Sequence, residues 1–152
     1  MRIGVISDTH GLLRPEAVQA LAGCAHILHA GDVGDDAILD ALRKIAPVTA
    51  VRGNVDHAGV CGALPPTEAI EFEGRLLYLL HRREDLDLHP QAAGIAAVLF
   101  GHSHQPEISW ADGVLFFNPG SAGPRRFQLP VTVGILECAQ NTLTPTIVPL
   151  LP

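Results

Sequence analysis

The stretch RIGVISDTHG, residues 2–11, joins a short apolar run to a polar turn. An apolar run of this length that ends in a turn predicts a buried β-strand, and the amphipathic segment 15–23 that follows it predicts a helix. The same succession continues along the chain, with strands expected at residues 25–30 and 47–52 and a helix from residue 35 or 36 to residue 44. Strands that alternate with helices predict parallel pairing and an α/β fold.

The second half of the chain has a different pattern, in which strand-like runs flank short turns. Glu73-Gly74 and Asp112-Gly113 stand between such runs, as in β-hairpins. Strands are expected at residues 67–72, 75–81, 96–100, 107–111, 114–117, 131–137 and 144–149, and a helix at residues 86–93. The sequence therefore predicts parallel strands first, antiparallel hairpins later, and helices on the outside of one domain.

Length and charge limit the class of protein. A chain of 152 residues matches one domain of ordinary size. Its net charge of −6 disfavours broad electrostatic binding to extended nucleic acid or to an anionic membrane. Its 8 histidines nearly equal the 10 lysines and arginines. Histidine is the commonest metal ligand, so this count directs attention to metal sites.

Targeting signals and disulfides are not indicated. The longest uncharged apolar run, residues 92–101, is half of what a membrane-spanning helix needs, and the run 3–7 is too short for a signal peptide. Cys24, Cys61 and Cys138 are far apart and odd in number, so we expect them to be buried and free. These features predict a cytoplasmic protein that does not associate with membranes.

Side chains able to bind a metal follow five of the expected strands. Because ligand sites in open α/β sheets lie at the carboxyl ends of the strands, these side chains are expected to converge. They are Asp8, His10, Asp32, Asn54, His81, His102 and His104. Nitrogen and oxygen donors without thiolate suit Mn²⁺, Fe²⁺, Ni²⁺ or Zn²⁺. Seven ligands exceed the needs of one such ion, and two ions that share a carboxylate would use them.

These residues form ordered motifs that resemble those of the calcineurin-like metallophosphoesterase superfamily. The motifs are Asp8-Thr9-His10, Gly31-Asp32-Val33, Gly53-Asn54-Val55-Asp56, His81 and Gly101-His102-Ser103-His104. Together with Asn118-Pro119-Gly120-Ser121 they are similar to the small YfcE-type phosphodiesterase branch, over roughly residues 1–121. The resemblance implies a four-layer α/β/β/α sandwich of mixed sheets and a single domain over residues 1–152.

The resemblance also implies a role for each ligand. Asp8, His10 and His104 would hold one divalent ion, Asn54, His81 and His102 would hold the other, and Asp32 would bridge them. The implied reaction is hydrolysis of a phosphate ester by attack of a metal-bridging hydroxide on phosphorus. Mn²⁺ is the leading choice of ion, with Fe²⁺, Ni²⁺ and Zn²⁺ as alternatives.

Two positions depart from the family pattern. Many members carry histidine directly after the motif asparagine, where it assists the leaving group, but this chain has Val55. Valine cannot donate a proton, so Asp56 and His57 are the candidate catalytic residues for that role. Arg82-Arg83 follows His81 where relatives often have Gly-His, so cations are expected to meet the substrate there.

Simpler interpretations stay open for several residues. Asp8 and Asp32 suit helix caps or turns, and Asn54 suits a left-handed turn. His26, His29 and His89 are interpreted as structural or surface residues, and Arg52 as a charge at a strand end. Two segments have two readings each, a tight turn or a role beside the metals for residues 118–121, and a solvated pair or a phosphate clamp for residues 125–126.

The leading hypothesis for function is a metal-dependent phosphoesterase acting on a small phosphate ester. A diester is favoured over a monoester because no cluster of several basic residues is present to bind a dianionic terminal phosphate. The alternatives are a phosphoesterase fold used as a scaffold for protein binding, and a nuclease or cyclic-nucleotide phosphodiesterase. The sequence is compatible with a homo-oligomer.

Overall fold

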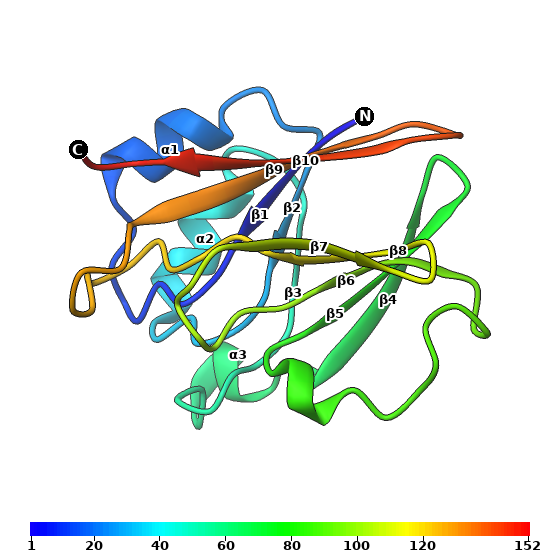
Figure 1. Cartoon of the computed structure of the whole chain (residues 1–152). Helices are drawn as coiled ribbons and strands as arrows, with labels where there is room; N and C mark the ends of the chain where they lie inside the picture. Colours follow the sequence, from blue (N-terminus) through cyan, green and yellow to red (C-terminus); the bar gives the residue numbers. More distant parts are fainter.

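The computed structural model describes all 152 residues, which form two five-stranded mixed sheets packed face to face (Figure 1). The first sheet holds, in spatial order, β10 (Leu143–Pro149), β9 (Thr132–Cys138), β1 (Arg2–Ile6), β2 (His26–His29) and β3 (Val48–Ala50). The second holds β4 (Thr67–Phe72), β5 (Arg75–Leu80), β6 (Ile95–Leu99), β8 (Val114–Asn118) and β7 (Glu107–Ala111). The predicted strands are confirmed, with small differences at their ends.

Each sheet has a parallel centre with antiparallel flanks. In the first sheet β1, β2 and β3 are parallel, whereas β9 and β10 run antiparallel to their neighbours. In the second sheet β5, β6 and β8 are parallel, and β4 and β7 are the antiparallel edge strands. The parallel βα units of the first half and the hairpins of the second half are therefore both present, as the sequence predicts.

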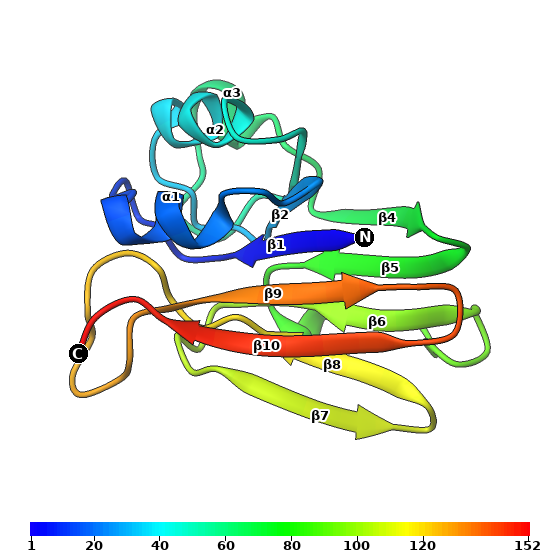
Figure 2. The ribbon, with the colours of Figure 1, turned by 90° about the horizontal axis from the view of Figure 1, so that it is seen from above.

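Apolar side chains fill the space between the layers of the sandwich. One cluster, which includes Val5, Leu99 and Phe117, fills the space between the two sheets. A second cluster joins the first sheet to its helices, α1 (Pro15–Leu21), α2 (Asp36–Arg43) and α3 (Gly59–Gly62). The helices lie on one side of that sheet, where α1 contacts β9, α2 contacts β3 and α3 contacts α2 (Figure 2). The mixed-sheet sandwich is confirmed, and none of its helices has the length and apolar character needed to cross a membrane.

The outer face of the second sheet is covered by a loop. The prediction of a helix at residues 86–93 is wrong, since this segment contains only bends and turns and follows the 3₁₀ turn η1 (Arg83–Asp85). Pro90 lies in its middle, where it removes a backbone donor and keeps the preceding residue out of the helical region. Leu86 and Leu88 pack from this loop onto the third apolar cluster of the sheet. The loop thus takes the place of a helical fourth layer.

The short helix α3 is absent from the sequence-based prediction. The carboxylate of Asp36, at the start of α2, accepts hydrogen bonds from the backbone N–H groups of Val60 and Cys61, at 3.2 and 3.0 Å. A carboxylate that caps a helix from 24 or 25 residues away leaves no local pattern.

The two ends of the sandwich differ in the segments that they carry: one has the loops that follow the parallel strands, and the other has the hairpin turns. The carboxyl ends of the parallel strands meet at one edge, where the Gly101 N–H donates to the His81 carbonyl and the Asp8 N–H to the Gly31 carbonyl. The hairpin turns β4–β5, β7–β8 and β9–β10 lie at the opposite edge, together with the N-terminus (Figure 1). The first edge therefore gathers the polar loops.

Candidate metal centre

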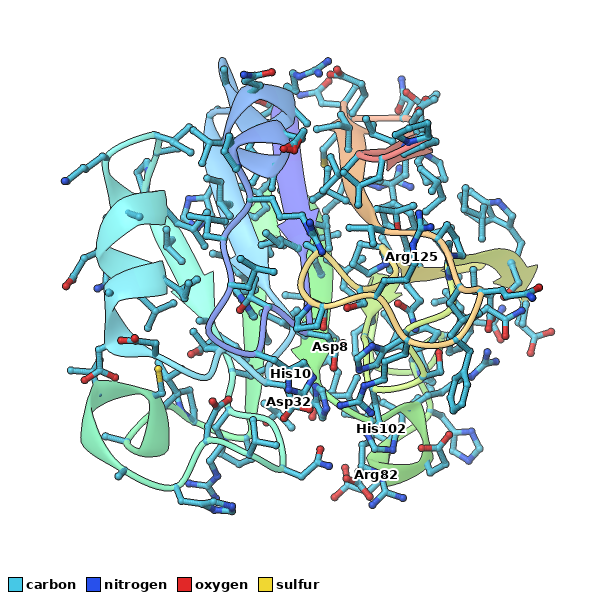
Figure 3. The ribbon with its side chains drawn as sticks, turned by 90° about the vertical axis from the view of Figure 1, so that its left-hand side faces the viewer. Asp8, His10, Asp32, Arg82, His102 and Arg125 are labelled. Atoms are coloured by element: carbon cyan, nitrogen blue, oxygen red, sulfur yellow. The ribbon has the colours of Figure 1, made fainter.

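Four loops at this edge carry a compact cluster of histidines and aspartates. Asp8 and His10 follow β1, Asp32 follows β2, His81 follows β5, and His104 lies in the loop after β6. Figure 3 views this edge and shows Asp8, His10 and Asp32 together with His102 beside them. Four of these five residues are buried, and the fifth, His10, is half-buried.

The donor atoms stand at distances that suit shared ions. The Nε2 atom of His10 is 3.5 Å from Asp8 Oδ1 and 3.5 Å from Asp32 Oδ2. The Nε2 atom of His81 is 3.2 Å from Asp32 Oδ2, and that of His104 is 3.3 Å from Asp8 Oδ1. Two ligands each ~2.1 Å from one ion are ~3.0 Å apart at an octahedral angle and ~3.4 Å apart at a tetrahedral angle. The cluster therefore forms two overlapping groups, Asp8–His10–His104 and Asp8–Asp32–His81.

Several of these atoms are buried without any hydrogen-bond partner. They are Asp8 Oδ1, His10 Nε2 and His81 Nε2. A buried polar atom left unpaired costs about 1–3 kcal/mol, so three in one cluster need a common explanation. Divalent ions satisfy nitrogen and carboxylate lone pairs together, and the residues present fit such ions.

The ring of His81 is fixed by the backbone. Its Nδ1 atom lies 2.8 Å from the carbonyl oxygen of Ala30 and donates to it, which directs Nε2 toward Asp32. Burial lowers the pKa of His81, but the Asp32 and Asp8 carboxylates outweigh this effect and hold the pKa above its ordinary value. Without metal, His81 binds a proton more readily than an ordinary histidine, so metal binding at this residue would release a proton.

One oxygen of Asp8 is held by the protein and the other is free. Oδ2 accepts hydrogen bonds from the Ser7 hydroxyl at 2.6 Å and from the His102 N–H at 3.0 Å. Burial raises the pKa of Asp8, but contacts with His10 and His104, the charge of His81 and the Ser7 hydroxyl together hold it well below its usual range. Asp8 is therefore a carboxylate whose free Oδ1 faces the histidines.

Asp32 stands between the two groups. Its Oδ1 accepts from the Val55 N–H at 3.0 Å, whereas Oδ2 lies between the Nε2 atoms of His10 and His81. Burial acts to raise the pKa of Asp32, but the His81 ring and the Val55 N–H lower it. Asp32 Oδ2 thus lies within 3.5 Å of one histidine from each group, whereas Asp8 is the residue that both groups share.

The backbone is strained where the ligands lie. Positive φ angles occur at Asp8 (57°), His10 (47°), Asp32 (55°), His102 (74°) and His104 (64°). Such angles are uncommon for residues other than glycine and cluster at functional sites. The surrounding loops thus hold five of the predicted ligands in conformations that they rarely adopt.

Two predicted ligands lie at the rim of the cluster. The ring of His102 is half-buried, and its centroid is 5.2 Å from that of His81. Asn54 is exposed and lines a pocket together with His81, and neither metal-binding group includes it. The structure thus brings five of the seven predicted side chains into direct proximity and places the other two beside them.

The geometry does not fit a proton-donating role for Asp56. Its buried carboxylate accepts three backbone hydrogen bonds, from Val33 at 3.2 Å, Gly34 at 3.0 Å and Gly53 at 2.8 Å. Both oxygens are therefore occupied, and they join the loop that carries Asp32 to the loop that carries Asn54. His57 is exposed and lines a separate pocket with Asp36.

His29, which the sequence predicts to be a structural or surface residue, is structural and braces the loops of the cluster. His29 is fully buried: its Nδ1 accepts from the Gly31 N–H at 3.1 Å, so its Nε2 carries the proton and donates to the Thr9 hydroxyl at 3.0 Å. That hydroxyl donates to the Val33 carbonyl at 2.8 Å. Burial lowers the pKa of His29 to about 4. Its place two residues before Gly31-Asp32 is the only signal in the sequence.

The turn after β8 braces a second loop. The Asn118 amide nitrogen donates to the Gly101 carbonyl at 3.2 Å and to the Ser103 hydroxyl at 3.1 Å. The Ser121 hydroxyl donates to the Asp8 carbonyl at 3.1 Å. Segment 118–121 is therefore both a turn and a support beneath the cluster.

Two other expectations have clear outcomes. Cys24, Cys61 and Cys138 are buried and free, as predicted. Arg125 is exposed and donates to the Pro152 carbonyl at 3.4 Å, which agrees with the interpretation of residues 125–126 as a solvated pair (Figure 3).

Comparison with known sequences agrees with this geometry. The model of the calcineurin-like phosphoesterase superfamily domain matches residues 1–141. A protein named as a probable metallophosphoesterase from Methanocaldococcus jannaschii is 37% identical over 134 residues, which cover 80% of this chain and 68% of that protein.

Solved structures share the fold at lower identity. A novel archaeal phosphodiesterase matches with a TM-score of 0.81 and 21% identity over 97% of this chain and all of that one. YfcE, a phosphoesterase from E. coli, matches with a TM-score of 0.73 and 24% identity over 99% of this chain and 100% of that one. Vps29 from Chaetomium thermophilum matches with a TM-score of 0.78 and 20% identity over 97% and 95%. The family match over residues 1–141 and the 37% identical relative show that the chain belongs to the calcineurin-like phosphoesterase superfamily.

Proposed function

We propose that this protein is a metal-dependent phosphodiesterase that binds two divalent ions and hydrolyses a small phosphate ester. The observation that carries this proposal is the buried cluster of unpartnered donor atoms in two groups that share Asp8, with Asp32 Oδ2 between His10 and His81. One domain over residues 1–152 provides the whole cluster.

Each side chain has a defined task in this proposal. Asp8, His10 and His104 would hold one ion, Asn54, His81 and His102 would hold the other, and Asp32 would be shared by both. When bound, the ions supply Lewis acidity toward the phosphoryl oxygens and lower the pKa of a water nucleophile. The Ala30 carbonyl orients His81, and Ser7 and the His102 N–H orient Asp8.

The arrangement favours substrates with good leaving groups. Val55 is exposed and apolar, and the oxygens of Asp56 are occupied by backbone N–H groups. Neither Val55 nor Asp56 can therefore protonate a poor leaving group. Aryl and other activated diesters need little such help.

The donor set and the cysteines support two finer assignments. Imidazole and carboxylate donors without thiolate favour Mn²⁺, with Fe²⁺, Ni²⁺ and Zn²⁺ as alternatives. Three free, buried cysteines without a disulfide support a reducing compartment, the cytoplasm.

The scaffold alternative is not favoured by the site. A protein that only binds partners has no need for five ligand residues with positive φ or for buried donor atoms without partners. The likeness to Vps29 shows a shared fold and carries no more weight than that.

The test is turnover of bis(4-nitrophenyl) phosphate with each of the four ions, together with metal analysis of the purified protein. We expect Mn²⁺-dependent release of 4-nitrophenol that a chelator abolishes and that is lost in Asp32→Asn and His102→Ala. Arg43→Gln, on the outer side of α2, is the matched control and retains full activity. If the folded protein shows no turnover with any of the four ions, the proposal is rejected.

A further inference from the structure

A pocket of about 370 Å³ opens beside the metal centre. It shares Asn54 and His81 with the proposed site. Arg52, Arg82 and Asp85 contribute the charged groups of its wall. Two guanidinium groups and one carboxylate leave a net single positive charge. The pocket is therefore suited to an anion next to the place where a phosphate would bind.

Arg52 has no carboxylate partner. It follows β3, and its backbone N–H donates to the Pro65 carbonyl at 3.0 Å, which fixes the base of the side chain. Its guanidinium makes one long contact, 3.5 Å from NH1 to the Leu64 carbonyl. Most of its donors thus remain available to a ligand in the pocket. The interpretation of Arg52 as a plain strand-end charge does not account for this position.

Arg82 and Arg83 are adjacent in sequence but differ in their contacts. Arg83 pairs with Glu107 at 2.8 Å and lies over the Phe116 ring at 4.3 Å, so its position is fixed by the fold. Arg82 has only a 3.6 Å contact with the exposed Glu84. Exposed pairs of this kind contribute little free energy, so Arg82 can turn to a ligand at small cost. Figure 3 shows Arg82 at the same edge as Asp32 and His102.

We propose that this pocket binds a second acidic group of the substrate, a carboxylate or phosphate on the ester substituent that stays attached to phosphorus. Arg52 and Arg82 are the specificity-determining residues, and each can form two parallel hydrogen bonds to such a group. His81 and Asn54 belong to the proposed metal site and also line the pocket with these arginines, so a substrate phosphate at the cluster can direct one substituent into the pocket. The inference rests on the proposed phosphodiesterase function and narrows its substrate class to anionic phosphodiesters.

Three 4-nitrophenyl phosphodiesters test the inference. Their second substituents are glycerate, glycerol and choline, which are anionic, neutral and cationic and of similar size. We expect kcat/KM with Mn²⁺ to be about tenfold higher for the glycerate ester than for the glycerol ester, and lowest for the choline ester. In the double variant Arg52→Gln/Arg82→Gln the ratio between the glycerate and glycerol esters falls toward one. Arg43→Gln keeps the wild-type ratio.

A binding measurement separates this inference from the phosphodiesterase proposal. Titration calorimetry compares 3-phosphoglycerate with glycerol 3-phosphate, which differ by a carboxylate in place of a hydroxymethyl group. We expect the wild-type protein to bind the carboxylate compound about tenfold more tightly, and the double variant to bind the two equally.

Each outcome has a distinct meaning. Equal kcat/KM for the glycerate and glycerol esters in the wild type, or a preference that survives in the double variant, would overturn the inference while the phosphodiesterase function stands. If no ester is hydrolysed, the phosphodiesterase proposal fails, and calorimetry alone decides whether the pocket binds anions.

Discussion

Replacing Asp56 with asparagine separates a structural role from a catalytic one. The carboxylate accepts backbone hydrogen bonds from Val33 and Gly53 at Oδ2 and from Gly34 at Oδ1. In Asp56→Asn the amide oxygen can take the Oδ2 position and keep the hydrogen bonds from Val33 and Gly53. The amide NH₂ group then faces the Gly34 N–H, and because both groups are donors this hydrogen bond is lost.

The expected cost follows from these contacts. One hydrogen bond to a charged group is lost, worth about 1.5–3 kcal/mol, and the other two lose their charge assistance. The free energy of unfolding should therefore fall by about 3 kcal/mol, a large part of the ~5–15 kcal/mol typical of a domain. Because these bonds join the loops that hold Asp32 and Asn54, metal affinity should also fall.

Urea unfolding in the presence of a chelator measures the stability loss, and a series of aryl phosphodiesters with leaving groups of rising pKa measures the catalytic effect. If Asp56 only holds the loops, the variant loses the same factor of activity for every leaving group. If Asp56 donated a proton, the loss would grow steeply with leaving-group pKa. Unchanged stability together with such a steep dependence would refute the structural role.

Three further outcomes are expected. Val55→His should raise activity on poorly activated phenyl diesters at least tenfold in steady-state assays, because it adds a proton donor beside the cluster, and Val55→Ala should not. Gly101→Ala should lower metal affinity at least tenfold by calorimetry, since a Cβ there would overlap the Asp8 carboxylate. Gly113→Ala, where a Cβ meets open space, should bind metal normally. His29 has a pKa of about 4 in the fold against 6.5 ordinarily, so its stabilising effect is complete above pH 6.5 and declines as the pH falls toward 4. Urea unfolding with chelator should show the wild type losing about 2 kcal/mol more than His29→Gln between pH 7.5 and pH 5.

The sequence predicts most of the fold because its strands have strong local patterns. The strands at residues 67–72 and 107–111 have the predicted bounds, since turn residues delimit them sharply. The helix expected at residues 86–93 fails because apolar residues at helical spacing surround Pro90, and their burial against the sheet is satisfied by a loop. The helix α3 depends on Asp36, a contact that forms only when the chain folds.

Part of the candidate site can also be predicted from the sequence, because its residues directly follow strands that have strong local patterns. Polar residues directly after parallel strands must meet at one edge, so Asp8, Asp32 and His81 can be brought together from the sequence alone. The tasks of Asp56 and Arg52 cannot be predicted in this way. The first depends on where N–H groups from two other loops point, and the second on which pocket an exposed side chain borders.

The polar loops and the hairpin turns lie at opposite edges of the sandwich. The hairpin turns are therefore suitable places to attach a label or a second protein. The turns at Glu73-Gly74 and Asp112-Gly113 close strands whose other ends face the cluster, and a Cβ on either glycine meets open space. A peptide tag, a fluorophore or a surface linker placed there would sit a full strand length from the ligands. The protein could thus be immobilised or displayed by one edge with its chemistry directed toward the solution.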